Sequence, residues 1–465
     1  MSLSKIIIYK NLNELLDFLK GNPEIELNEI DEYGYTPLIQ AAIVNSKPKA
    51  ELLLRAGANV NFTDLTGRTA LHWAADNNNF ELTKLLLQSG ADPNAYSYAG
   101  QPVLVMPLLR KQNRLKKLLV EKSANIDFAE DFINAKLLGH SFELEGRIDI
   151  IDNKNTFIEV ELEGFYLEFS IQILITSLLE FYKNFGGKYF REYFPHLEKI
   201  IAALQVGGEL VKFQHYLTDI AANEKRINEL LDSEPLVLPL AFDGHAITLI
   251  KYANMLIRCD RGEFGRENGT VIFYKMANPH GVDKNFCKEL LYKRQPREFI
   301  NQGMISYLGL EPKFTLPLSI QRAGNCSFAN VEAIIPTLMF LFLLEEKGLE
   351  KFSLCEKEAL EFYNEWKEWD KERSLFFCID SFHEANPARK ASKAALLATI
   401  LFQACSYENN RDPHKAYRII SILTIKEYDY ILKSYFKVFQ KDKDNANLKS
   451  LSEFLDDYRM RYENL

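Results

Sequence analysis

The chain of 465 residues is longer than one ordinary domain, and its 47% hydrophobic and 26% charged residues are typical of a folded soluble protein. A formal net charge of −8 argues against nucleic acid or an anionic membrane as the main partner. Six cysteines without a CxxC pair exclude a disulfide framework or a zinc knuckle and predict free thiols in a reducing compartment.

The first residues, MSLSKIIIYKNLNELLDFLKG, lack the basic, apolar and small-residue pattern of a cleaved signal. If the protein leaves its cell of origin, we therefore expect a route that needs no cleaved signal.

Residues 1–130 carry a repeat. Gly34, Gly67 and Gly100 recur every 33 residues, and the unit GRTALHWAADNNNFELTKLLLQSGADPNA is similar to the ankyrin consensus. The flanking segments 11–30 and 101–127 fit degenerate terminal repeats, which are atypical because one face of each meets solvent or another domain. About four ankyrin repeats are therefore predicted, and His72 is expected to be a structural turn residue rather than a ligand.

The exposed tips of such repeats are the expected contacts with a partner protein. The candidates are Tyr33, Tyr35, Arg68 and Tyr98, because aromatic and arginine side chains dominate the energetics of interfaces.

Beyond residue 130 the 33-residue period disappears. Alternating apolar residues in FELEGRIDIID and TFIEVELEGFYLEF predict strands, helical patterns follow within residues 171–230, and strands return over residues 235–276. We expect an α+β domain over residues 131–345 and a helical region over residues 346–465. The apolar run at residues 333–344 contains Pro336 and is too short to cross a bilayer, so it predicts a buried helix and no membrane span.

A hairpin in the second part brings two titratable side chains together. A two-residue turn at Ala253-Asn254 would pair Tyr252 with Met255 and place Asp260 diagonally across from His245, on the same face. A histidine oriented by a carboxylate is half of a nucleophile-activating triad. Asp243 is a rival orienting acid, and Asp260 could instead pair with a neighbouring arginine, Arg258 or Arg261.

Cys326 stands where a loop meets the long apolar helix. A thiol at a helix N-terminus feels the positive end of the helix dipole, which favours the thiolate. Gln321 could donate an amide hydrogen bond to an oxyanion, together with a backbone N–H near Cys326. The alternatives are a buried core thiol for Cys326 and a satisfied core histidine for His245. Cys378 with His383 is a competing pair that we interpret as structural.

The order His245, Asp260, Gln321, Cys326 resembles that of the adenain-type cysteine proteases, which include SUMO-family proteases and YopJ-type acetyltransferases. Ala246 stands where that family often has tryptophan, and Ser327 where it commonly has glycine. The strand GHAITLI and its hairpin also resemble the His-to-Asn hairpin of papain. The resemblance implies a multidomain α+β protein: an ankyrin solenoid, a papain-like or adenain-like cysteine-protease domain and a C-terminal helical region.

The order of domains, with the segments FINAKLLGHSFELEG and QRAGNCSFANVEA, also resembles the ankyrin-containing type IV-secreted effectors of Legionella. That resemblance implies export by the Dot/Icm system into a host cell, where the protein would act in the cytosol or nucleus.

These features together predict a monomeric effector that binds a host protein through its repeats and acts on it by thiol-based acyl transfer, as peptide or isopeptide hydrolysis. Catalysis would rest on Cys326, His245, Asp260 and Gln321, without a metal or cofactor. The alternatives are a non-enzymatic scaffold with a degenerate protease-like domain and a YopJ-type acetyltransferase.

Overall fold

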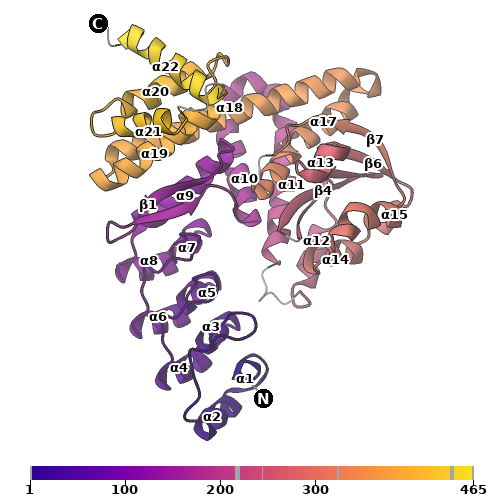
Figure 1. The fold of residues 1–465 in the computed structure, drawn as a ribbon. Coiled ribbons are helices and arrows are strands. Elements are labelled where there is room, and N and C mark those ends of the chain that lie inside the picture. Colours follow the sequence, from indigo (N-terminus) through magenta and orange to yellow (C-terminus); the bar gives the residue numbers. More distant parts are fainter. Residues whose placement is uncertain (1–2, 215–219, 243, 322–323, 440–444, 463–465) are drawn as a thin grey trace.

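The protein was analysed as a computed structural model that describes residues 3–214, 220–242, 244–321, 324–439 and 445–462. In Figure 1 a row of helix pairs rises from the N-terminus to the centre of the molecule, a sheet with its helices lies to the right, and the C-terminal helices lie at the top.

The first region consists of four successive helix pairs, as the repeat predicts. They are α1 (Leu3–Tyr9) with α2 (Leu12–Gly21), α3 (Pro37–Ile43) with α4 (Lys47–Arg55), α5 (Ala70–Asp76) with α6 (Phe80–Gln88), and α7 (Val105–Leu109) with α8 (Asn113–Glu121). His72 is buried and its Nδ1 accepts a hydrogen bond from the backbone N–H of Thr69 at 3.1 Å. Burial lowers the pKa of His72 to about 3, which confirms a neutral, structural histidine.

The loops between the helix pairs, the finger loops, stack on one another through glycines. A Cβ at Gly67 (φ +80°) would lie 2.7 Å from the Tyr98 ring of the next loop. At Gly100 (φ +75°) the nearest atom, 2.8 Å away, belongs to Val160, which lies in the hairpin of β1 (Arg147–Ile151) and β2 (Phe157–Glu161). This hairpin therefore takes the place of a further finger loop and ends the row.

Helix α9 (Ile126–Ser141) joins the stack to the hairpin, and α10 (Leu167–Lys183) follows it. The strand predicted over residues 156–169 is shorter than expected. Gly164 has a positive φ of 68°, which ends the extended run, and the chain enters α10 three residues later.

A five-stranded antiparallel sheet in the order β3-β4-β5-β6-β7 forms the centre of the second region, with helices inserted before and between its strands. The elements are η1 (Gly186–Tyr193), α11 (Phe194–Lys212), α12 (Glu224–Leu230), β3 (Leu236–Phe242), β4 (His245–Tyr252), β5 (Met255–Cys259), α13 (Glu263–Asn268), β6 (Val271–Met276), η2 (Pro279–Gly281), α14 (Lys284–Tyr292), the π-helix η3 (Phe299–Gly303), α15 (Met304–Leu308) and β7 (Leu310–Leu316).

Consecutive residues of the central strands are apolar and point to opposite sides, so both faces of the sheet are buried. One face packs on α10, α11, α16 (Cys326–Glu332) and α17 (Ile334–Lys347), and the other on α12, α14 and α15. The α+β prediction is confirmed, although β7 and the helices α13 to α15 were not predicted.

The apolar helical stretch is longer than the run seen in the sequence. Cys326–Lys347 has the length and composition of a membrane span, but 94% of its most apolar window is buried inside the protein. Pro336 lies in the first turn of α17, where a missing N–H breaks no helical hydrogen bond. The stretch fits a core helix of a soluble protein, as predicted.

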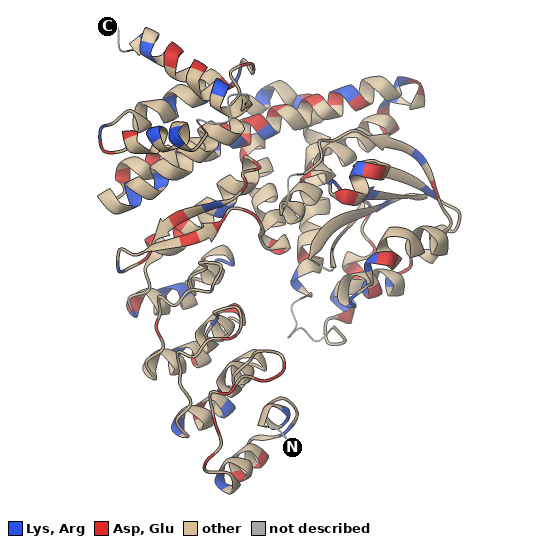
Figure 2. Ribbon diagram, viewed as in Figure 1, with Lys and Arg blue, Asp and Glu red and all other residues tan. Residues whose placement is uncertain are grey.

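The C-terminal region is helical, as predicted. After η4 (Leu349–Lys351) it comprises α18 (Phe352–Glu384), α19 (Pro387–Ala404), α20 (Asp412–Leu423), α21 (Asp429–Phe439) and α22 (Ala446–Tyr462). Helix α18 carries charges of both signs along its length (Figure 2). Its first half packs Phe362 and Trp366 on the core beside the sheet, whereas Leu375 and Phe382 join the core of the ankyrin stack, α9, the β1–β2 hairpin and α19 to α22.

Candidate thiol site

The hairpin that carries His245 and Asp260 has the predicted register. Tyr252 pairs with Met255 across a turn at Ala253-Asn254. Strand β4 begins at His245 and β5 ends one residue before Asp260, and the Nε2 of His245 lies 3.0 Å from the Oδ1 of Asp260. The structure therefore brings the two side chains into hydrogen-bond contact.

Asp260 is fully buried and multiply hydrogen-bonded. Its Oδ2 accepts from the guanidinium of Arg258 at 2.7 Å, and its Oδ1 also accepts from the backbone N–H of Gly262 at 3.1 Å. Burial opposes ionisation, but the His245 hydrogen bond and the Arg258 charge outweigh it and lower the pKa of Asp260. Asp260 thus pairs with His245 and also with Arg258, one of the two arginines offered as alternative partners, whereas the other, Arg261, pairs with Glu332 and Glu143. Asp243, the rival orienting acid, lies outside the described residues.

Arg258 binds the Asp260 carboxylate opposite His245. The sequence offered it only as a partner in place of His245, not as a second partner within the site. Arg258 is 2% exposed, donates to the carbonyl of Ile300 at 2.9 Å and to Asn301 at 2.6 Å, and stacks 3.6 Å over the Phe264 ring. Arg258 and Asp260 are two residues apart at the end of a strand, so their side chains lie on the same face. This spacing is the signal in the sequence that could have identified Arg258.

Cys326 is the first residue of α16 and the one cysteine of the six that is not buried. Burial would raise the pKa of its thiol, but a hydrogen bond with His245, supported by backbone hydrogen bonds from Ala246 and Ser327, lowers it overall. Burial likewise disfavours charge on His245, yet Asp260 and Cys326 raise its pKa to about 9. The two shifts favour a thiolate beside an imidazolium.

The other five thiols have the opposite character. Burial raises the pKa in every case: Cys259, Cys287, Cys355, Cys378 and Cys405. Cys378 lies in the core on α18, in keeping with its interpretation as structural.

Gln321 is held beside the site by Asn330, which the sequence analysis missed. Asn330 is fully buried on α16, and its Nδ2 donates to the carbonyl of Ala246 at 2.6 Å and to the Oε1 of Gln321 at 3.3 Å. Its Oδ1 accepts from the backbone N–H of Arg261 at 2.7 Å. Because Oε1 faces Asn330, the Gln321 NH₂ group points elsewhere, and it donates to no group among the described residues. The signal for Asn330 was its place one turn after Cys326, on the same face of the helix.

The loop before Cys326 is fixed by the region that follows the ankyrin stack. The buried ring of His140, on α9, donates from Nδ1 to the Oδ1 of Asn325 and stacks on Phe328 at 5.6 Å. Burial lowers the pKa of His140 to about 4, so the ring is neutral. The N–H of Gly164 donates to the carbonyl of Gly324 at 2.9 Å. The backbone next to Cys326 is thus anchored to α9 and to the segment before α10.

The four candidate tip residues divide into two pairs. Tyr33 and Tyr98 are 68% and 76% exposed on the finger loops. Tyr35 packs edge-on against Trp73 at 5.7 Å, and Arg68 pairs with Asp76 and lies 4.1 Å over the same indole. Tyr35 and Arg68 therefore pack on Trp73 inside the stack, and only Tyr33 and Tyr98 of the four are exposed at the tips.

Within the described part of the chain, no group of three or more His, Cys, Asp or Glu side chains is arranged to hold a metal ion.

Comparison with known proteins agrees with this architecture. Residues 4–97 match the family model described as ankyrin repeats in three copies. The whole chain is similar to the solved structure of the Legionella effector AnkH, at 41% sequence identity over 98% of this chain and 97% of that chain, with a TM-score of 0.84. No functionally curated protein matches the chain.

Proposed function

Because the chain belongs to the family of AnkH-type ankyrin effectors, whose repeats bind proteins, we propose that it binds a host-cell protein and acts on that protein by thiol-based acyl transfer. The proposed reaction is hydrolysis of a peptide or isopeptide bond. The observation that carries it is the contact of one accessible cysteine with a histidine that a buried carboxylate orients.

In the proposed reaction the Cys326 thiolate attacks the carbonyl carbon. A carbon–sulfur bond forms and the carbonyl π electrons move onto oxygen. The tetrahedral intermediate collapses as His245 gives its proton to the leaving nitrogen and the carbon–nitrogen bond breaks, which leaves a thioester. Neutral His245 then takes a proton from water, whose oxygen attacks the thioester and releases the acid and the thiolate.

Asp260 supports both steps from its buried position. Its hydrogen bond to Nε2 fixes the imidazole so that the other ring nitrogen is available to Cys326. The carboxylate also stabilises the imidazolium, in line with the raised pKa of His245 of about 9.

The oxyanion would form next to Gln321. The Gln321 amide, oriented by Asn330, and the backbone N–H of Cys326 are the proposed donors. Removing one such donor typically slows acyl transfer by about 100- to 1,000-fold. The arrangement of a cysteine at a helix N-terminus against a hairpin that bears histidine and aspartate supports a papain-like or adenain-like domain.

The ankyrin stack would select the substrate. A protein held at the finger loops is present at the thiol site at a high effective concentration, so a site with little intrinsic selectivity can act on one target. Cys326 and the stack are physically connected through α9 and Asn325, which supports a single functional unit.

The test compares host proteins in cells that receive the wild-type protein or Cys326→Ala, by mass spectrometry of new N-termini and of lysine isopeptides. New termini or lost isopeptides that require both Cys326 and His245 are expected, with His383→Gln, an exposed histidine on α18, as the matched control. Identical host profiles for the wild type and Cys326→Ala would instead mean that the domain only binds. Cysteine-dependent acetylation without cleavage would mean an acetyltransferase.

A further inference from the structure

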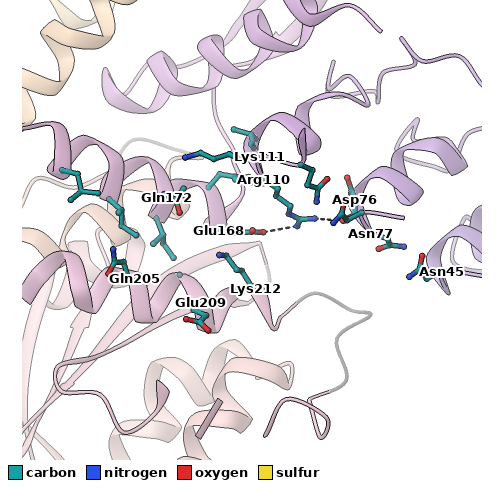
Figure 3. Close-up of a pocket in the computed structure, with 18 residues that line it drawn as sticks. Asn45, Asp76, Asn77, Arg110, Lys111, Glu168, Gln172, Gln205, Glu209 and Lys212 are labelled. Atoms are coloured by element: carbon teal, nitrogen blue, oxygen red, sulfur yellow. Dashed lines mark hydrogen bonds and ion pairs between the residues drawn. The ribbon is translucent and has the colours of Figure 1, made fainter. Parts of the chain in front are cut away.

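A cleft of about 860 Å³ lies between the ankyrin stack and the α+β region (Figure 3). No described residue of the thiol site or of the finger tips lines it. One wall consists of the turns that join the two helices of a repeat, in three consecutive repeats. The other wall consists of the outward faces of α10 and α11.

The repeat wall presents a polar side chain at the same point of each of the three repeats. Asn45, Asn78 and Lys111 recur at intervals of 33 residues, all line the cleft, and all have a positive φ between 53° and 57°. The left-handed conformation suits asparagine and turns each exposed side chain outward at the same point of its repeat. On the opposite wall, Gln172 and Gln205 add two further amides. The Oδ1 of Asn45 already accepts from Asn79 at 2.6 Å. The Asn45 NH₂ group and the other amides can still donate and accept, which matches the alternating N–H and C=O groups of an extended polypeptide.

The carboxylates of the cleft are already neutralised by arginines of the protein itself. The three pairs are Asp76 with Arg68, Glu168 with Arg110 at 3.0 Å, and Glu209 with Arg226 at 2.7 Å. Arg110 also donates to the carbonyl of Asp76 at 2.6 Å, so its guanidinium joins two repeats to each other and, through Glu168, to α10.

Two lysines of the cleft form no ion pair of this kind in the described part of the chain, although the charge of Lys212 contributes to lowering the pKa of Glu209. Lys111, from the repeat wall, and Lys212, from α11, are exposed and form no ion pair within the described residues. Figure 3 shows them on the two walls. A ligand that pairs with these two ammonium groups would supply negative charge of its own.

We propose that this cleft binds an extended acidic polypeptide segment, whose carboxylates pair with Lys111 and Lys212 and whose main chain pairs with the amides of Asn45, Asn78, Gln172 and Gln205. A polypeptide fits better than a nucleic acid, because the two lysines could pair with only two phosphates of a strand that carries one on every nucleotide, and the protein has a net charge of −8. The segment belongs to a protein partner and contacts the turn edge of the repeats, not the finger loops.

The test measures fluorescence anisotropy of a labelled peptide of alternating Glu and Ser with the full-length protein, against a peptide with Gln in place of Glu. The Glu peptide is expected to bind at least about tenfold more tightly, and its affinity should fall as salt screens the charges. Lys111→Glu with Lys212→Glu should abolish this preference. Lys117→Glu with Lys225→Glu makes the same charge change on α8 and α12, outside the cleft, and should preserve it.

Three outcomes overturn the proposal: equal binding of the two peptides, equal weakening by the two double variants, or tighter binding of a single-stranded oligo-uridine probe through the same lysines. Lys111→Ala with Lys212→Ala, checked by thermal unfolding, distinguishes loss of binding from loss of fold, since both side chains are exposed. Acyl transfer at Cys326 does not enter any of these measurements.

Discussion

Replacing His245 by glutamine tests whether Cys326 is an activated thiolate. The glutamine keeps a polar side chain at this partly exposed position but cannot carry a proton charge. Burial, which by itself raises the pKa of the Cys326 thiol, would then be opposed only by the backbone hydrogen bonds from Ala246 and Ser327. We therefore expect the pKa of Cys326 to rise.

The size of the effect follows from the lost contact. A hydrogen bond to a charged group contributes about 1.5–3 kcal/mol, which at 1.36 kcal/mol per unit corresponds to a pKa increase of about 1–2 units. Each unit lowers the thiolate population about tenfold but makes the remaining thiolate about threefold more nucleophilic. The net alkylation rate on the acidic side of both pKa values should therefore fall about 3- to 10-fold.

The assay is iodoacetamide alkylation over a range of pH, with mass spectrometry of the peptide that contains Cys326. The five buried cysteines serve as internal standards, and His383→Gln serves as the matched control. In the wild type, the thiolate–imidazolium pair should persist up to the His245 pKa of about 9 and be lost above it, as the imidazolium deprotonates. An unchanged profile in His245→Gln, or a Cys326 rate no faster than those of the buried thiols, would refute the reasoning.

Three further substitutions probe the surroundings of the site. Asp260→Asn removes the counter-charge of buried Arg258 and should lower the free energy of unfolding by about 3 kcal/mol, measured by urea titration. A variant as stable as the wild type would contradict the buried ion pair. Gly262→Ala would place a Cβ 2.8 Å from the Cε1 of His245 and displace the ring. Cys326 alkylation should therefore slow, while far-UV circular dichroism stays unchanged. An unaltered alkylation rate would show that the ring can move without losing its contact with Cys326. Asn330→Leu leaves the carbonyl of Ala246 and the N–H of Arg261 unpaired. The free energy of unfolding, measured by thermal unfolding, should fall by about 2–5 kcal/mol. An unchanged stability would mean that these two groups find other partners.

The parts of the site that the sequence predicted are local in the chain. A two-residue turn and the period of two along a strand fix the relation of His245 to Asp260, because both lie on one hairpin. The N-terminal position of Cys326 on its helix followed from the change between loop and apolar run. The ankyrin repeats were predictable for the same reason, since each repeat is defined by its own turn residues and its neighbour.

The parts that the sequence did not predict depend on packing between distant segments. Arg258 reaches Asn301, 43 residues away, and His140 reaches Asn325, 185 residues away. No turn length or local period encodes such distances. The inward position of Tyr35 and Arg68 likewise depends on Trp73, which lies in a neighbouring helix and not in their own loops.

The 33-residue helix α18 has a consequence for how the protein unfolds. At 1.5 Å per residue it is about 50 Å long, and its two halves belong to different apolar cores. Opening either core would expose apolar surface on half of this helix, so we expect the amide protons of its two halves to exchange with solvent at similar rates, as one cooperative unit. A chain that ends at residue 345 would lack this shared element and would leave both cores open to water.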